Sequence, residues 1–243
     1  MLVAAIDTAT LVLSVALCEA DAVGVRVLAE AREEAQRGGH GARLPGALLE
    51  LLQARGLGTA HVGGWVCGVG PGSFTGLRIG VATWKGFAYA HRRPLVGASS
   101  LAAMALEAAA SAPPEAVLVP LLDAKKGEVY AGFFRAAGQG VEPVAPEAAL
   151  APDALAERVR ALPGAVVFGH GVRAYPALAA LPVLASGPAT PSAVALSRLA
   201  APALASAAFD ATQVFALEPH YVRASEAEVK FPHGLGPGST QPR

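Results

Sequence analysis

A glycine-rich stretch, residues 68–80, holds the residue types that are most typical of a chemical site in this sequence. It reads Gly-Val-Gly-Pro-Gly-Ser-Phe-Thr-Gly-Leu-Arg-Ile-Gly. Glycines before a helix allow backbone N–H groups to bind a phosphate at the helix N-terminus. However, no Lys-Ser or Lys-Thr follows Gly76, as a P-loop requires, and the glycines lack the G-x-G-x-x-G spacing of dinucleotide sites. Pro71 also stands where a nucleophile elbow around Ser73 needs glycine. The stretch therefore predicts neither a phosphate loop nor a nucleophilic serine.

The aspartate of Asp7-Thr8-Ala9 could position a nucleotide from a hairpin turn. In kinases that hold a nucleotide in this way the turn reads Asp-x-Gly, because glycine lets the backbone approach a phosphate. The methyl group of Ala9 would obstruct that approach, so we interpret Asp7 as a residue that stabilises the turn. Gly169-His170-Gly171 could mark the remnant of an adenosine pocket, but we interpret it as a turn at a strand end. We therefore expect no cofactor and assign no cofactor-binding residue.

The histidines predict no metal site. A pair of histidines four residues apart on a helix would be a strong signal for a metal, and none of the six histidines has such a partner. A hydrolase would need a metal or a serine-based triad, and neither is evident. We therefore assign no catalytic residue and no metal ligand.

The composition fits a folded protein without an overall charge that would attract nucleic acid. Of the 243 residues, 53% are hydrophobic and 16% are charged, and nineteen basic residues balance nineteen acidic ones. A protein that holds tRNA alone should carry clustered Lys and Arg. We therefore expect this chain to contact tRNA only indirectly.

The cysteines and the apolar runs indicate a cytoplasmic protein. Cys18 and Cys67 lie in apolar strand-like runs and are interpreted as buried free thiols. The sequence has no signal-peptide pattern, and no apolar run reaches the length of about 18 residues that a membrane span requires. We expect no membrane association.

The order of apolar runs predicts two similar α/β halves. Each half should contain three strands, a helix, a strand and a helix, repeated about 100 residues apart. Ser99 should cap a further helix that joins the halves and ends near residue 110. In the first half we predict strands at 2–6, 11–17, 25–30 and 64–69 and helices at 43–55 and 73–90. In the second half we predict strands at 117–122, 128–134, 141–144 and 165–168 and helices at 152–161 and 191–205.

This arrangement is typical of the α/β architecture of actin, Hsp70 and the sugar kinases, which is RNase H-like. In that class a nucleotide lies between the halves. We therefore divide the chain into an N-terminal docking lobe (1–97), a C-terminal lobe (98–230) and a flexible tail (231–243). The tail has too little apolar surface to fold.

Several short motifs, in their order along the chain, resemble the TsaB (YeaZ) family, and the resemblance covers about residues 1–228. The glycine-rich stretch is the hallmark. The matches outside it are Ile6–Thr10, His40 with Leu44-Pro45, Ser99–Leu101, Asp123–Tyr130 and Pro219–Arg223. The residues that carry the family motifs are Asp7, Gly70, Gly72, Ser73, Thr75, Gly76 and Arg78.

The resemblance implies a non-catalytic paralogue of a TsaD-type catalytic subunit. That subunit makes N6-threonylcarbamoyladenosine on tRNA next to the anticodon, and the TsaB-type subunit docks on it as a scaffold and activator. A TsaE-type ATPase completes the bacterial complex. The chain is then not an enzyme on its own.

Two predicted helices carry more apolar or small surface than one sheet needs. The leucines of helix 43–55 extend over a wide part of its circumference. Either some of them contact a partner protein or the whole helix is deeply buried in the core. On helix 73–90, Phe74, Leu77, Val81, Trp84 and Ala88 should face the core, and Arg78, Lys85 and Tyr89 share a second face. A third, small-residue face should approach another helix, either 43–55 or one from a partner. The predicted interface residues are Leu44, Leu48, Leu51, Leu52, Thr75, Gly76, Ile79, Ala82, Thr83 and Gly86.

We expect the same helices to pair with a second copy of the chain when the partner is absent, because apolar docking surface is costly to expose. The alternative to a docking subunit is an ATP-dependent small-molecule kinase of the same architecture. Nucleotide binding with turnover would favour the kinase.

Overall fold

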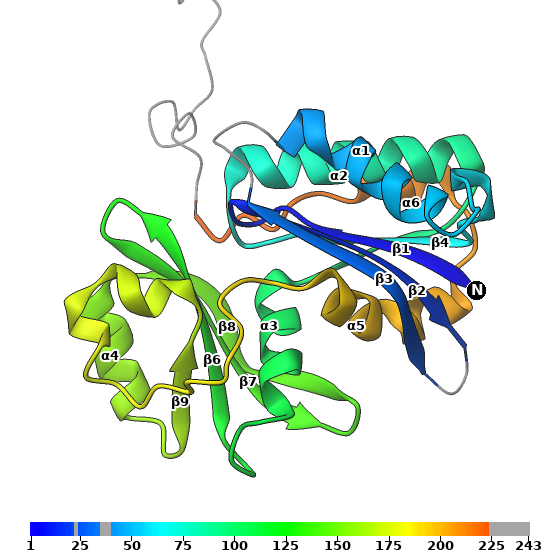
Figure 1. Ribbon diagram of the computed structural model, residues 1–243. Helices are drawn as coiled ribbons and strands as arrows, with labels where there is room; N and C mark the ends of the chain where they lie inside the picture. Colours follow the sequence, from blue (N-terminus) through cyan, green and yellow to red (C-terminus); the bar gives the residue numbers. More distant parts are fainter. Residues whose placement is uncertain (22–23, 35–39, 224–243) are drawn as a thin grey trace, which may run out of the picture.

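The computed structural model describes residues 1–21, 24–34 and 40–223. The predicted tail at 231–243 therefore lies outside the described residues. Two sheets, each with its own helices, form the fold (Figure 1).

The first sheet has the strand order β3-β2-β1-β4-β5. The pairs β1–β2 and β2–β3 are antiparallel, whereas β4 runs parallel to both β1 and β5. Strands β1, β2 and β4 are buried almost throughout, as expected for strands covered on both faces. The strands are β1 (Leu2–Asp7), β2 (Val12–Ala20), β3 (Val25–Glu34), β4 (Gly64–Gly68) and β5 (Leu95–Ala98).

The second sheet repeats this order as β8-β7-β6-β9. Its first three strands are antiparallel neighbours, and β9 runs parallel to β6, as β4 does to β1. The repeat confirms the two similar α/β halves that the sequence predicted. The strands are β6 (Val117–Lys125), β7 (Glu128–Ala137), β8 (Gly140–Leu150) and β9 (Ala165–Phe168).

Helices cover both sheets (Figure 1). Helices α1, α2 and α6 lie on one face of the first sheet, α5 lies on its other face, α3 lies between the sheets, and α4 covers the far face of the second sheet. Short 3₁₀ helices connect some elements: η1 (Thr59–His61), η2 (His170–Ala174) and η3 (Pro176–Leu178). The α-helices are α1 (His40–Gln53), α2 (Phe74–His91), α3 (Ser100–Ala109), α4 (Pro152–Arg160), α5 (Ala193–Ser206) and α6 (Ala211–Ala216).

The core under α1 and α2 is organised around two tryptophans. Trp65 of β4 and Trp84 of α2 meet edge to face with ring centroids 5.6 Å apart, and Phe87 stacks on Trp65 at 5.1 Å. Trp84 Nε1 donates to Ala4 O at 3.1 Å, which ties α2 to β1. This contact fixes which face of α2 points at the sheet.

Two features differ from the sequence-based expectation. Strand β8 continues to Leu150, well past the predicted end at 144, as an edge strand that pairs with β7 as far as Val129–Leu150. The chain also returns to the first sheet after the second, since α5 and α6 pack against the first sheet and α6 was not predicted. The lobe boundary at 97/98 stays a prediction.

Candidate functional site

The turn after β1 is held by the side chain of Asp7, which is 1% exposed. Its Oδ1 accepts a hydrogen bond from Ala9 N at 2.8 Å. Its Oδ2 accepts one from Ser100 Oγ at 2.6 Å, at the start of α3. Asp7 therefore stabilises its own turn, as predicted, and also fastens that turn to a distant helix, which the sequence did not indicate.

The glycine-rich stretch wraps around this turn. A Cβ at Gly72 would overlap Ala9, and a Cβ at Gly76 or Gly80 would overlap Thr8. At Gly72 and Gly76 a Cβ would meet a backbone oxygen of the hairpin turn, and at Gly80 it would meet the side-chain hydroxyl of Thr8. The approaching segment is the hairpin turn, so the expectation that a second helix explains the glycines of α2 is wrong for Gly76 and Gly80.

The backbone groups at the start of α2 are used within the chain. Ser73 N donates to Ala9 O at 2.7 Å, and Leu77 N donates to Ser73 O at 2.9 Å. Ser73 Oγ caps the helix by accepting from Gly76 N at 3.2 Å. A phosphate loop needs such N–H groups to point at its ligand. Here these three already have partners within the protein.

The segment 217–223, which we call the strap, lies over the glycine-rich stretch. His220 N donates to Val69 O at 2.7 Å. Arg78 Nε donates to Tyr221 Oη at 2.9 Å, and the rings of Tyr221 and Phe74 are 5.1 Å apart. Phe74 is 41% exposed although Tyr221 contacts its ring, so its predicted place on the core face of α2 is wrong. The physical reason is that Phe74 is the first residue of the helix, beyond the edge of the sheet core.

The strap also contacts the second sheet. Arg223 forms an ion pair of 2.9 Å with Glu128 of β7. His220 Nδ1 lies 3.3 Å from Glu147 Oε2 of β8, although without hydrogen-bond geometry. Ser99 Oγ donates to the other oxygen of Glu147. Burial raises the pKa of Glu147, and the Ser99 hydrogen bond and the nearby His220 oppose that rise.

The Ser99–Glu147–His220 cluster is not a hydrolase triad. In a triad the histidine lies between the nucleophile and the carboxylate and takes the proton from the nucleophile. Here Glu147 lies between Ser99 and His220. Ser99 Oγ also caps α3 by accepting from Ala102 N at 3.0 Å. This arrangement offers Ser99 no imidazole base and does not support triad hydrolysis.

The corresponding turn of the second half holds Asp123. Its Oδ1 accepts from Lys125 N at 2.8 Å and from Tyr175 Oη at 3.3 Å. Burial raises the pKa of Asp123, but the bonds from Lys125 outweigh that effect, and the pKa is lowered. Gly169 and Gly171 lie so close to the Leu121 backbone that a Cβ would overlap it. The Gly169–Gly171 segment is thus a closely packed strand-end turn, in agreement with the interpretation from the sequence.

The predicted interface residues fall into two groups. Leu44, Leu48 and Leu52 are fully buried in the core under α1, so the idea that they face a partner needs correction. A wide apolar stripe on this helix covers the core rather than a second surface. Gly76 is also buried against Thr8, and Leu51 is partly buried against the same core.

The rest of the predicted set reaches the surface. Thr75, Ala82 and Gly86 are exposed, and Ile79 and Thr83 are half-buried. A Cβ added at Gly86 would meet open space. Leu49 of α1 is 40% exposed and was left out of the predicted set, although it lies at the outer edge of the leucine stripe, about 140° around the helix from Leu44. We call Leu49, Thr75, Ile79, Ala82, Thr83 and Gly86 the docking face.

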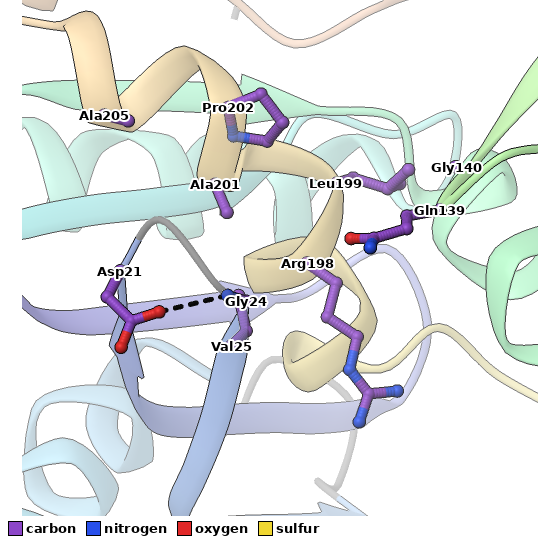
Figure 2. A pocket seen from close by; sticks show the side chains of 10 residues that line it. All are labelled: Asp21, Gly24, Val25, Gln139, Gly140, Arg198, Leu199, Ala201, Pro202 and Ala205. Atoms are coloured by element: carbon purple, nitrogen blue, oxygen red, sulfur yellow. Dashed lines mark hydrogen bonds between the residues drawn. The ribbon is translucent and has the colours of Figure 1, made fainter.

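A cavity of about 680 Å³ lies away from the motif, where the β2–β3 connection and the β7–β8 turn meet α5 (Figure 2). Asp21 Oδ1 accepts from Gly24 N at 3.0 Å at its rim, and Arg198 points along the opposite wall. The other lining residues are mostly small or apolar. This cavity contains none of the residues that the sequence singled out.

Two kinds of feature are absent from the described residues. No group of three or more His, Cys, Asp or Glu side chains in residues 1–21, 24–34 and 40–223 is placed to hold a metal. Within the same residues, no helix combines the length and apolarity needed to cross a bilayer.

The family model of TsaD, described as tRNA N6-adenosine threonylcarbamoyltransferase, matches residues 33–213. The TsaB protein of Escherichia coli, a tRNA threonylcarbamoyladenosine biosynthesis protein, is 35% identical over 73% of this chain and 75% of its own length. The chain belongs to the TsaB (YeaZ) family. The Bacillus subtilis TsaB is 27% identical over 95% of this chain and 98% of its own length.

Solved TsaB-family (YeaZ) structures agree over most of the chain. YeaZ from Pseudomonas aeruginosa superposes with a TM-score of 0.71 at 29% identity, covering 88% of this chain and 98% of that one. A second Pseudomonas aeruginosa protein, described as similar to the peptidase YeaZ, gives a TM-score of 0.75 at 30% identity over 91% and 99% of the two chains. The family and the α/β fold class predicted from the motifs are therefore confirmed.

Proposed function

We propose that this TsaB-family chain is a non-catalytic scaffold that binds and activates a TsaD-type catalytic subunit in the synthesis of N6-threonylcarbamoyladenosine on tRNA. One observation carries the proposal: the polar groups of the family motif form hydrogen bonds within the chain. Asp7 binds Ser100 and its own turn, and Ser73 caps α2. The names of the relatives supply the reaction. A role in tRNA modification supports a cytoplasmic location.

The kinase alternative is less well supported. The relatives are named for tRNA modification rather than for a kinase activity. Ala9 blocks the phosphate approach in the first turn, and Ser73 N, Gly76 N and Leu77 N have partners inside the chain. Titration of the full chain with ATP should show neither tight binding nor turnover.

The docking face is the surface that we assign to the catalytic subunit. Its residues are uncharged, and the small side chains at Ala82 and Gly86 allow a helix backbone to approach closely. Leu49, on the neighbouring helix α1, adds exposed apolar area. Such a surface is stable when covered. In the absence of the partner we expect the same face to pair two copies of the chain, and a TsaE-type ATPase would complete the complex.

Two matched pairs of variants test the docking face. Ala82→Arg places a long side chain where it can reach solvent, so the free energy of unfolding should change by less than about 1 kcal/mol. In the complex the charge must be desolvated, which costs on the order of 3 kcal/mol and weakens binding about a hundredfold. Leu77→Arg on the buried face should instead unfold the chain. In the same way, Leu49→Arg at the exposed position should fold and lose binding, whereas Leu48→Arg at the buried position should unfold the chain.

The measurements are thermal melting of each variant and its co-elution with the TsaD-type subunit. Normal melting with lost co-elution supports the docking face, whereas normal melting with retained co-elution places docking elsewhere. Transfer activity should require both subunits. Modified tRNA produced by this chain alone would contradict a non-catalytic role.

A further inference from the structure

A basic and aromatic stripe runs along α2, beside the docking face. Arg78, Lys85 and Tyr89 repeat at helical spacing, Arg92 follows as the C-cap residue, and residues 78–91 span about 20 Å at 1.5 Å per residue. At about 100° per residue this line lies about 90° around the helix from the docking face. Both surfaces can therefore be occupied at the same time.

Every aromatic side chain that is exposed within the described residues lies on this stripe. They are Phe74 at 41%, Tyr89 at 52%, Phe215 at 57% and Tyr221 at 40%. Phe74 and Tyr221 flank the N-terminal end of α2, and Tyr89 and Phe215 flank its C-terminal end. A random distribution of surface aromatic side chains would not concentrate them along one helix, so their clustering in the stripe requires a functional explanation.

Cations alternate with these rings. The Arg78 guanidinium lies 4.0 Å from the Phe74 ring centroid, and that of Arg92 lies 5.0 Å from the centroid of Phe209. Lys85 Nζ donates to Phe215 O at 2.7 Å, which ties the ammonium group to the backbone of that residue. Arg93 is exposed next to Arg92. Asp210, which caps α6, and Glu218 are the carboxylates that flank Phe209 and Phe215 in the sequence.

The ring pair at the C-terminal end is open to a planar ligand. Tyr89 and Phe215 have ring centroids 5.2 Å apart and planes inclined by 49°. Both rings are more than half exposed. Exposed rings next to Lys and Arg are the chemistry with which proteins bind single-stranded nucleic acid, because bases stack on rings while cations contact phosphates.

We propose that this stripe binds a single-stranded segment of RNA, with Tyr89 and Phe215 as the stacking platform and Lys85 and Arg92 as phosphate contacts. The inference rests on the proposed function, which brings the chain to tRNA. It revises the expectation that tRNA contact is only indirect. A neutral chain cannot attract RNA over its whole surface, but a local line of cations can add a secondary contact within an assembled complex.

The test compares single variants of the full-length chain. Tyr89→Ala removes a stacking ring, and Tyr89→Phe keeps it and serves as the conservative variant. Arg92→Ala removes a phosphate contact. Val144→Ala and Arg160→Ala are matched controls, because they remove an exposed apolar side chain and an exposed arginine on the second half of the fold. Thermal melting verifies that each variant is folded.

The probe is a fluorescently labelled tRNA with an unmodified adenosine next to its anticodon, titrated against the chain alone and against its complex with the TsaD-type subunit. We expect Tyr89→Ala to weaken RNA binding about tenfold and Tyr89→Phe to retain it. Arg92→Ala should also reduce by about one the slope of log affinity against log salt concentration. Co-elution with the catalytic subunit should be unchanged.

Two outcomes would overturn the stripe as an RNA site. One is RNA affinity in Tyr89→Ala and Arg92→Ala equal to that of the two control variants. The other is loss of co-elution with unchanged RNA affinity, which would make the stripe a protein contact. Failure of the proposed function would give a different result. The wild-type chain would then not co-elute with the catalytic subunit, whereas its RNA affinity could still be measured with the chain alone.

Discussion

Ser100 Oγ donates a hydrogen bond of 2.6 Å to Asp7 Oδ2, so the first turn of the chain is fastened to the helix that leads into the second half. Both side chains are buried, at 0% and 1% exposure. A buried polar group that loses its partner carries the full cost of its desolvation. This pair therefore links the stability of the turn to that of α3.

Asp7→Ala should lower the free energy of unfolding by about 1–3 kcal/mol, because it leaves Ser100 Oγ and Ala9 N without their partner. Asp7→Asn keeps an acceptor for one of them and should lose less. Thermal melting measures both. If the folded Asp7→Ala variant still binds the catalytic subunit but the complex loses activity, Asp7 has a chemical role that the structural interpretation denies.

Gly76→Ala and Gly86→Ala should shift stability in opposite directions. A Cβ at position 76 would overlap the Thr8 backbone, and the resulting strain should cost about 1–3 kcal/mol. At position 86 the Cβ meets open space, and alanine should stabilise α2 by about 0.5–1 kcal/mol. Chemical denaturation of the two variants gives the comparison. Equal destabilisation by both would mean that the turn does not press on α2 at Gly76.

Glu147 should make the protein less stable as the pH rises. Burial raises its pKa in the folded chain, so the folded state holds this proton more tightly than the unfolded state does. The destabilising effect of Glu147 is absent below the unfolded pKa of about 4.3, where the carboxyl is protonated in both states. The free energy of unfolding declines as the pH rises from there through the folded pKa. Glu147→Gln should remove that part of the decline. Melting temperatures across a pH series measure it, and identical pH profiles for the two proteins would refute the assignment.

The two thiols should be inert in the folded chain. Burial raises the pKa of both Cys18 and Cys67, and both side chains are fully buried, so little thiolate forms or meets a reagent. Iodoacetamide at about pH 8 should label neither cysteine until a denaturant is added, as judged by the mass of the intact protein. Fast labelling of Cys67 in the native state would show that the first sheet opens locally.

Local sequence was enough to indicate the fold class. Apolar runs and helix caps act over a few residues, which is why Ser73 and Ser99 start helices where the pattern predicts them. The repeated order of strands and helices follows from the same short-range patterns. Helix faces were harder to predict, because the leucines of α1 cover a wide arc and periodicity alone does not say where along that arc the core ends, between the buried Leu52 and the exposed Leu49.

The sequence by itself determined the family, the duplicated α/β order and the role of Asp7 in its own turn, since each depends on residues that are close together in the chain. Only the tertiary structure decided which segment presses on Gly76, that Ser100 holds Asp7, and that the strap contacts Phe74 and Arg78. It also gathered Tyr89 and Phe215 into one exposed surface. These contacts join residues far apart in sequence, and no local propensity specifies such pairs because they form only when the sheets and helices pack.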